Sequence, residues 1–195
     1  ILPGTKSTIA DLRWLRQCGL EAAIHKAADA GTLVFGVCGG YQMLGRTVSD
    51  PEQVEAAGTT EILGMGLLEM DTIFLGEKVQ TQTTGVFSGI SGMLSDLNGM
   101  SYSGYEIHMG RSEEEMPALA GTGNVYGSYV HGVFDASGIS DTILKALCVR
   151  KGIDFDALET FDISEYKEHQ YDLLADAVRS GLDMEFVYRI LNREV

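Results

Sequence analysis

Cys38 lies where residue type and surroundings together point to covalent catalysis. Residues 36–40 read Gly-Val-Cys-Gly-Gly and follow an apolar run. This is the nucleophile-elbow pattern, in which a strand turns sharply into a helix and exposes the central side chain. The helix N-terminus favours a thiolate, so we expect the pKa of Cys38 to lie below the ~8.5 of a free cysteine. The amide N–H of Gly39 is placed to bind an oxyanion. The alternative, an inert buried cysteine, is disfavoured by the flanking glycines.

A cysteine nucleophile needs a base, and two histidines compete for that role. His131 follows a short strand-like run, so it is expected at the carboxyl end of a strand, where open α/β sheets form their sites. His108 lies in the β-rich stretch 104–110. Spacing alone leaves both histidines open as the base. His25 and His169 have polar helical surroundings and are expected on the surface.

The other chemistry-bearing residues argue against metal and nucleotide sites. Cys18 and Cys148 have apolar helical neighbours, so we expect both to be inert. The sequence contains no CxxC pair, no HExxH, no zinc-like Cys/His spacing and no GxxxxGK[ST] phosphate loop. We therefore expect no metal and no cofactor in this chain. Three widely spaced cysteines form no disulfide framework, which makes a reducing cytoplasm the expected compartment.

Composition and charge limit the classes of partner. The chain has 195 residues, of which 45% are hydrophobic and 22% charged, as in a globular domain with one core. The net charge of −14 argues against nucleic acid, and no run approaches the ~20 apolar residues of a membrane span. The first fifty residues carry five basic and four acidic side chains, whereas residues 51–195 carry nine and twenty-four. We expect any anionic ligand to meet the first fifty residues.

The elements that must position these residues alternate between helix and strand. A buried strand is predicted over residues 32–37. The β-rich region 66–109 is expected to add strands, some antiparallel, at one side of the sheet, and its segments 72–74 and 79–84 are separated by Gly76. Predicted helices cover residues 8–18, 21–30, 41–46 and 164–191, with another after Gly138. The last of these is expected to break near residues 181–183. This order predicts an α/β, flavodoxin-like fold with a mostly parallel sheet and helices on both faces.

The chain is expected to be one domain, 1–195, taken from a longer protein. Ile1 and Leu2 resemble the end of a strand, so we expect strands that precede them to be missing. Pro3 and Gly4 form the loop that leaves this strand, and its backbone N–H groups are a second candidate source of oxyanion donors. The core is expected over about 1–150, with a helical extension over about 151–195.

Four stretches together resemble the class I glutamine amidotransferase family. The most similar members are the C-terminal glutaminase domains of the cobyric acid synthase family. The stretches are residues 2–16, 36–45, 104–110 and 129–135, and the tail over 165–184 is also similar. All class I members share the elbow, whereas the first and third stretches are specific to the corrinoid enzymes. The resemblance extends from one end of the chain to the other.

The resemblance implies a catalytic role for each matching residue. Cys38 attacks the side-chain amide of glutamine, ammonia leaves, and the glutamyl thioester is hydrolysed. His131 matches the catalytic histidine of the family, which implies that it is the base in place of its competitor. Gly4 and Gly39 match the oxyanion positions, and Gln42 matches the residue that helps to hold the substrate glutamine.

One departure from the family concerns the group that orients His131. Most class I members carry glutamate two residues after the catalytic histidine, and this chain has Val133 there. The related corrinoid enzymes lack the glutamate as well, which implies a Cys–His dyad. Asp135 and Glu106 are the two candidates for an orienting group.

The resemblance also implies partners outside this chain. In the family, an upstream synthetase domain uses ATP and Mg²⁺ to activate carboxylates b, d, e and g of adenosylcobyrinic acid a,c-diamide. Ammonia from glutamine then amidates them during cobalamin biosynthesis. Two alternatives remain. One is the glutaminase of another amidoligase, such as that of the lipid-linked peptidoglycan precursor, which leaves stretches 2–16 and 104–110 unexplained. The other is a catalytically idle α/β docking module, which glutamine hydrolysis would exclude.

Overall fold

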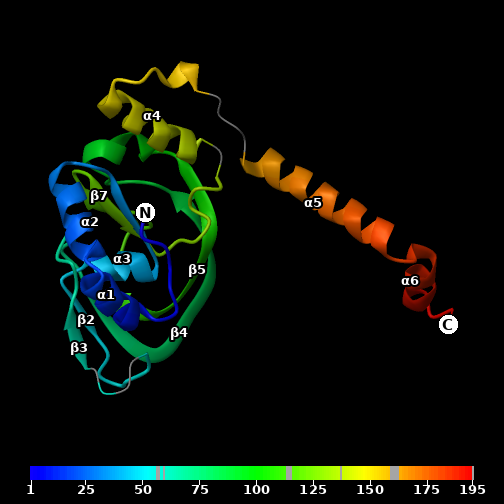
Figure 1. The fold of residues 1–195 in the computed structure, drawn as a ribbon, viewed down its shortest axis with the longest axis horizontal. Helices are drawn as coiled ribbons and strands as arrows, with labels where there is room; N and C mark the ends of the chain where they lie inside the picture. Colours follow the sequence, from blue (N-terminus) through cyan, green and yellow to red (C-terminus); the bar gives the residue numbers. More distant parts are fainter. Residues whose placement is uncertain (56–57, 59, 113–115, 137, 159–162, 195) are drawn as a thin grey trace. The chain divides into compact units, whose positions relative to one another are not determined.

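The chain divides into two compact units in the computed structural model (Figure 1). The first unit is Ile1–Phe155 and the second is Asp156–Val195. The structure describes residues 1–55, 58, 60–112, 116–136, 138–158 and 163–194. The predicted nucleophile and both candidate bases lie in the first unit.

A three-stranded sheet forms the centre of the first unit. Its order is β1 (Val34–Val37), β7 (Val125–Ser128) and β6 (Ala120–Thr122). β1 and β7 are parallel, and β6 is antiparallel to β7. On its other side β1 forms a parallel bridge from Gly36 to Leu2. The predicted buried strand before the elbow is therefore confirmed, because β1 has parallel partners on both sides.

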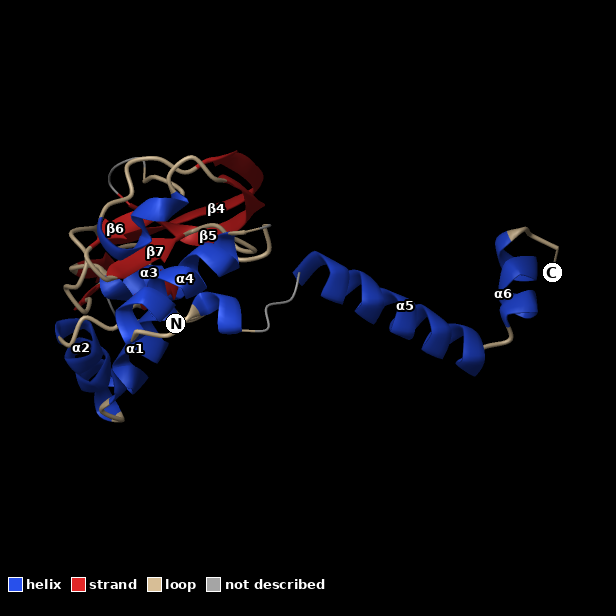
Figure 2. Ribbon diagram, turned by 90° about the horizontal axis from the view of Figure 1, so that it is seen from above, coloured by secondary structure: helices blue, strands red, loops and turns tan. Residues whose placement is uncertain are grey.

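Helices pack on both faces of this sheet. They are α1 (Thr8–Gln17), α2 (Leu20–Asp29), α3 (Gly39–Leu44) and α4 (Ile139–Lys151). Val34 of β1 shares a buried cluster with Leu12 of α1 and Ala28 of α2, which lie side by side (Figure 2). The next residue, Phe35, belongs to a second cluster with Ile139 of α4. Because neighbouring strand residues point to opposite faces, these clusters cover the two faces of the expected α/β sheet.

A second sheet lies beside the first and carries the β-rich region. Its order is β3 (Glu61–Leu63), β2 (Thr47–Ser49), β4 (Asp71–Val86) and β5 (Ser101–Ser112). β4 and β5 form a long antiparallel ribbon (Figure 1). These strands were expected to extend the central sheet, but they form a separate sheet, and among the described residues one β-bridge, between Tyr105 and His131, joins the two. The contact needs Gly104, because a Cβ there would lie 2.2 Å from the His131 carbonyl oxygen.

β4 is one strand where the sequence predicts two β segments separated by Gly76. The pairing of β4 with β5 shifts register between Phe74 and Val79, so the ribbon absorbs the interruption without ending. The Gly76 N–H donates to the Glu52 carboxylate at 3.2 Å. The glycine therefore marks an irregularity inside the ribbon.

The second unit consists mainly of two helices, α5 (Ile163–Gly181) and α6 (Met184–Leu191). The break predicted near residues 181–183 is confirmed. Asp183 caps α6, because its carboxylate accepts the Phe186 N–H at 3.0 Å. Among the described residues, no helix combines the length and apolar character that a membrane crossing needs.

Candidate active site

Cys38 occupies a sharp elbow between β1 and α3. Its φ of 50° and ψ of −112° are unusual for a residue with a side chain, and such strain clusters at functional sites. The flanking glycines are needed for close packing. A Cβ on Gly36 would lie 2.7 Å from the Gly40 carbonyl oxygen, and one on Gly40 would lie 2.2 Å from the Leu2 carbonyl oxygen. The glycine pattern thus predicted the elbow correctly.

The thiol of Cys38 is buried and forms a hydrogen bond to backbone. Its Sγ lies 3.6 Å from the carbonyl oxygen of Ile107 in β5, and 6% of the residue is exposed. Burial raises the pKa of the Cys38 thiol and the charge of Glu106 raises it further, while the Gly39 N–H lowers it. The expectation of a lowered pKa is therefore wrong, because the desolvation of the thiolate outweighs the donors at the start of a six-residue helix.

His131 follows β7 and lies against the aromatic ring of Tyr105. The two rings stack at a centroid distance of 5.1 Å and an angle of 6°. Backbone hydrogen bonds of 2.8 and 3.1 Å join the same two residues. Burial lowers the pKa of His131, and the nearby His108 lowers it further, so the imidazole is neutral near pH 7. Its Nε2 is buried and has no hydrogen-bond partner among the described residues.

Gly4 lies beside both Cys38 and His131. A Cβ on Gly4 would be 3.2 Å from His131 Cε1 and 3.4 Å from Cys38 Cβ. Among the described residues no hydrogen bond joins the thiol to the imidazole, since the thiol donates to the Ile107 carbonyl oxygen and Nε2 of His131 has no partner. Such contacts are often long in enzymes without substrate. The two groups share a hollow of about 460 Å³, which we call the base hollow; its lining is Gly4, Thr5, Lys6, Cys38, Tyr105, Ile107 and His131.

His108 lies nearby on β5 with both ring nitrogens engaged. Nδ1 contacts the Gly110 carbonyl oxygen at 2.6 Å, and Nε2 contacts the Glu106 carboxylate at 3.2 Å. The ring also stacks on Tyr129 at 4.1 Å. Glu106, one of the two candidates to orient the other histidine, is thus paired with His108. Asp135 lies in the turn after His131 and donates its N–H to the Gly132 carbonyl oxygen at 2.9 Å.

The remaining predicted site residues border the elbow. A Cβ on Gly39 would lie 3.1 Å from the Thr5 nitrogen, so the loop that contains Gly4 packs directly on the elbow. Gln42 is 2% exposed, and its Oε1 accepts a hydrogen bond from Thr8 Oγ1 at 3.1 Å. Its Nε2 is buried and has no partner among the described residues. Gln42 is therefore held at one end and keeps a free donor at the other.

A second hollow on the other side of the thiol has a volume of about 350 Å³. We call it the head-group hollow. Its lining is Thr5, Lys6, Thr8, Cys38, Gln42, Val54, Glu55, Phe74, Lys78, Ile107, His108 and Met109. Among the described residues, no group of three or more His, Cys, Asp and Glu side chains is arranged to hold a metal ion.

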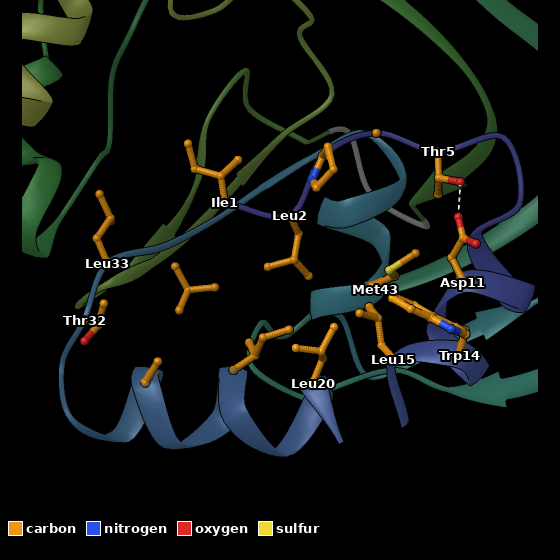
Figure 3. A pocket seen from close by; sticks show the side chains of 15 residues that line it. Ile1, Leu2, Thr5, Asp11, Trp14, Leu15, Leu20, Thr32, Leu33 and Met43 are labelled. Carbon is orange, nitrogen blue, oxygen red and sulfur yellow. Dashed lines mark hydrogen bonds between the residues drawn. The ribbon is translucent and has the colours of Figure 1, made fainter. Parts of the chain in front are cut away.

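A larger, apolar hollow lies between α1, α2 and the start of β1 (Figure 3). Its volume is about 640 Å³, and side chains such as Trp14, Leu15 and Met43 line it. Asp11 is the single acidic side chain in its lining and accepts a hydrogen bond from Thr5. Neither Cys38 nor His131 lines this hollow, so its size does not mark the site of the proposed chemistry.

The sequence pattern did not reveal the role of β5 at the site. Tyr105 stacks on His131, and the carbonyl oxygen of Ile107 binds the thiol. Alternation along the strand places residues 105 and 107 on the same face, and this was the available signal. Cys18 is exposed at the end of α1, where apolar burial was expected, and Cys148 is buried in α4.

An elbow cysteine beside a neutral histidine on an α/β sheet defines a cysteine-dependent acyl-transfer type of site. The chain belongs to the CobB/CobQ-like glutamine amidotransferase domain family, which matches residues 1–139. It is thus a domain of a glutamine-hydrolysing enzyme, and the matched range contains both Cys38 and His131.

The most similar curated proteins bear one name. The chain is 49% identical over 220 residues to the cobyric acid synthase of Lachnoclostridium phytofermentans, covering 100% of this chain and 42% of that protein. It is 44% identical over 214 residues to the cobyric acid synthase of Ruminiclostridium cellulolyticum, covering 100% and 41%. A crystal structure of a glutamine amidotransferase matches with a TM-score of 0.47 and 19% identity over 77% of each chain. The chain spans about two fifths of the length of these curated relatives.

Proposed function

We propose that this chain is the glutaminase part of a cobyric acid synthase. It would hydrolyse glutamine and supply ammonia for the ATP-dependent amidation of carboxylates b, d, e and g of adenosylcobyrinic acid a,c-diamide. The observation that carries this proposal is the 49% identity to a cobyric acid synthase over the whole chain. In this proposal, ATP and Mg²⁺ act in a synthetase part of the protein that lies outside this chain.

The first chemical step pairs nucleophilic attack with proton transfer. The raised pKa of Cys38 and the lowered pKa of His131 both favour the neutral thiol and neutral imidazole over an ion pair. Cys38 therefore becomes a thiolate only as the glutamine amide arrives and its proton moves to Nε2 of His131. Sγ then attacks the amide carbon to form a tetrahedral adduct.

The oxyanion of this adduct forms next to the elbow. The backbone N–H of Gly39 and the loop at Gly4 lie against each other there, which supports their assignment as donors. When the carbon–nitrogen bond breaks, His131 returns the proton to the leaving nitrogen, and ammonia departs. A glutamyl thioester remains on Cys38.

Water completes the cycle. His131, neutral again, takes a proton from water as the oxygen attacks the thioester carbon, and the carbon–sulfur bond breaks with return of that proton to Cys38. The sum is glutamine and water giving glutamate and ammonia. Val133 is buried in an apolar cluster, where the usual orienting glutamate would stand. We assign the orienting role to the stacked ring of Tyr105, which leaves the reactive groups as a Cys–His dyad.

The test separates ammonia production from ammonia use. In the full-length protein, Cys38→Ser should lose amidation of the corrinoid with glutamine and retain amidation with added ammonium salt, at a rate that rises with pH because NH₃ is the attacking species. Failure of ammonium to rescue a folded variant would contradict the proposal. Rescue with a lipid-linked peptidoglycan acceptor in place of the corrinoid would favour the other amidoligase, and wild-type protein without glutamine hydrolysis would favour a docking module.

A further inference from the structure

We propose that the head-group hollow binds the charged end of free glutamine, with Glu55 on the α-ammonium group and Lys6 and Lys78 on the α-carboxylate. The proposal rests on the proposed glutaminase function and adds the residues that select the substrate. All three side chains line the same hollow as Cys38.

Hydrogen bonds to both the side chain and the backbone of Glu55 fix its position. Its carboxylate oxygens accept the backbone N–H groups of Thr8 at 2.6 Å and Ile9 at 2.9 Å, at the start of α1. The backbone N–H groups of Val54 and Glu55 in turn donate to Asp50, a fully buried carboxylate, at 2.8 and 3.0 Å. An ionised carboxylate has about four lone-pair sites, so Glu55 can cap α1 and still accept from an ammonium group.

The two lysines bring positive charge to a protein with a net charge of −14. Lys6 follows the Gly4 loop and lines both hollows beside the thiol, and Lys78 comes from β4 next to the register shift. Both side chains are exposed, and neither forms an ion pair among the described residues. They are thus free to bind a carboxylate.

The rest of the lining suits the uncharged part of glutamine. Gln42 contributes its unpartnered Nε2 from a side chain that is 2% exposed. The apolar side chains of Val54, Phe74 and Met109 can contact the two methylene groups. A volume of about 350 Å³ lies at the lower end of the range for small-molecule pockets, which is about 300–1,000 Å³.

Opposite charges in one hollow define the ligand class. A free amino acid carries an ammonium group that Glu55 can bind and a carboxylate that the lysines can bind, whereas an N-acylated glutamine lacks the ammonium group. We therefore infer that the site selects free L-glutamine over N-acylated glutamine and over glutamine within a peptide.

Labelling of Cys38 with two alkylators tests this assignment in the full-length protein. The diazo-ketone analogue of L-glutamine carries both head-group charges, and chloroacetamide carries neither. Glu55→Gln and Lys6→Met should each slow labelling by the diazo-ketone about 10-fold, the effect of one charge-assisted hydrogen bond, and leave labelling by chloroacetamide within about twofold. Labelling is measured at the Cys38 peptide by mass spectrometry. Glu52→Gln is the matched control, since this exposed side chain lines neither hollow and should leave both rates unchanged.

The outcomes distinguish failure of the head-group site from failure of the proposed glutaminase function. Unchanged diazo-ketone rates in both variants would overturn the head-group site while leaving the glutaminase intact. Equal slowing with both reagents would also overturn it, because the residues would then act on the thiol or the fold. Wild-type protein whose Cys38 the diazo-ketone does not label would overturn the glutaminase itself. Lys6→Met removes no helix cap, so it reports on the site even where Glu55→Gln fails to fold.

Discussion

The turn after β7 and the strand β5 each bring a histidine to the site, and the two differ in what their ring nitrogens do. His131 has a buried Nε2 without a partner, whereas both nitrogens of His108 contact acceptors. A base must have a nitrogen that can take a proton, so the first arrangement suits catalysis and the second suits structure. Both histidines have a glycine within two residues, so the difference between them lies in their hydrogen bonds.

Removal of His131 should have the largest effect. His131→Ala deletes the group that accepts the thiol proton, and general acid–base catalysis contributes about 10²–10⁴-fold to rate. We expect a fall of that size in glutamine hydrolysis by the full-length protein, measured as glutamate released. Ammonium-dependent amidation serves as the control and should remain. A loss of less than about 10-fold would transfer the role of base to another residue.

Separation of β5 from the turn that carries His131 should have the next largest effect on the glutaminase rate. Gly104→Ala places a Cβ 2.2 Å from the His131 carbonyl oxygen and 2.6 Å from Val130 Cγ1. The ribbon must then move away from the turn, and a displacement of 1 Å can cost about 10²-fold in rate. Gly76→Ala on β4 meets only the flexible end of Glu52, at 3.3 Å, and should retain activity. Equal glutaminase rates for the two variants would show that the bridge does not position the base.

Substitution of His108 should have a smaller effect. His108→Asn loses the stack on Tyr129 and weakens the contacts to Glu106 and the Gly110 carbonyl oxygen. These contacts hold β5 in place, so we expect about a tenfold fall in glutaminase rate, equivalent to about 1.4 kcal/mol. The free energy of unfolding should fall by a similar amount. A loss as large as that of His131→Ala would reverse the comparison.

The pH profile should show the smallest but most specific effect. The pKa of His131 is lowered, so its neutral form persists below the ~6.5 of free histidine and activity on the acid side should fall only beneath that pH. The pKa of Cys38 is raised, so alkylation of Cys38 by chloroacetamide should have its midpoint above the ~8.5 of free cysteine. Free cysteine in the same buffers is the control. An acid limb above pH 6.5 would contradict the assignment of His131.

The elbow could be predicted from the sequence because glycine marks positions where the backbone leaves no room for a side chain. Gly36 and Gly40 lie so close to neighbouring backbone that a Cβ would clash, and the glycine residue type itself indicates such positions. The buried strand before the elbow and the helix pair after the first loop follow from apolar periodicity. These local patterns account for the correct α/β architecture.

The hydrogen bonds and the burial of the site residues could not be predicted from local sequence patterns, because they depend on contacts between distant parts of the chain. The pKa of Cys38 depends on how much of the thiol β5 covers, and β5 lies about seventy residues further along the chain. The role of Glu55 depends on its contact with α1, more than forty residues away. Short strands such as β2 and β3 gave no signal, because three residues contain too little periodicity.

The hydrogen bond from the Cys38 thiol to the Ile107 carbonyl oxygen bears on how the protein survives oxidants. Peroxides attack the thiolate, and a cysteine that remains a buried thiol until substrate arrives presents little of that form. Cys18 also donates to a backbone carbonyl oxygen, that of Leu15, but its side chain is exposed, so it should form sulfenic acid first when peroxide is added. A nucleophile that depends on its base for activation thereby gains durability between turnovers.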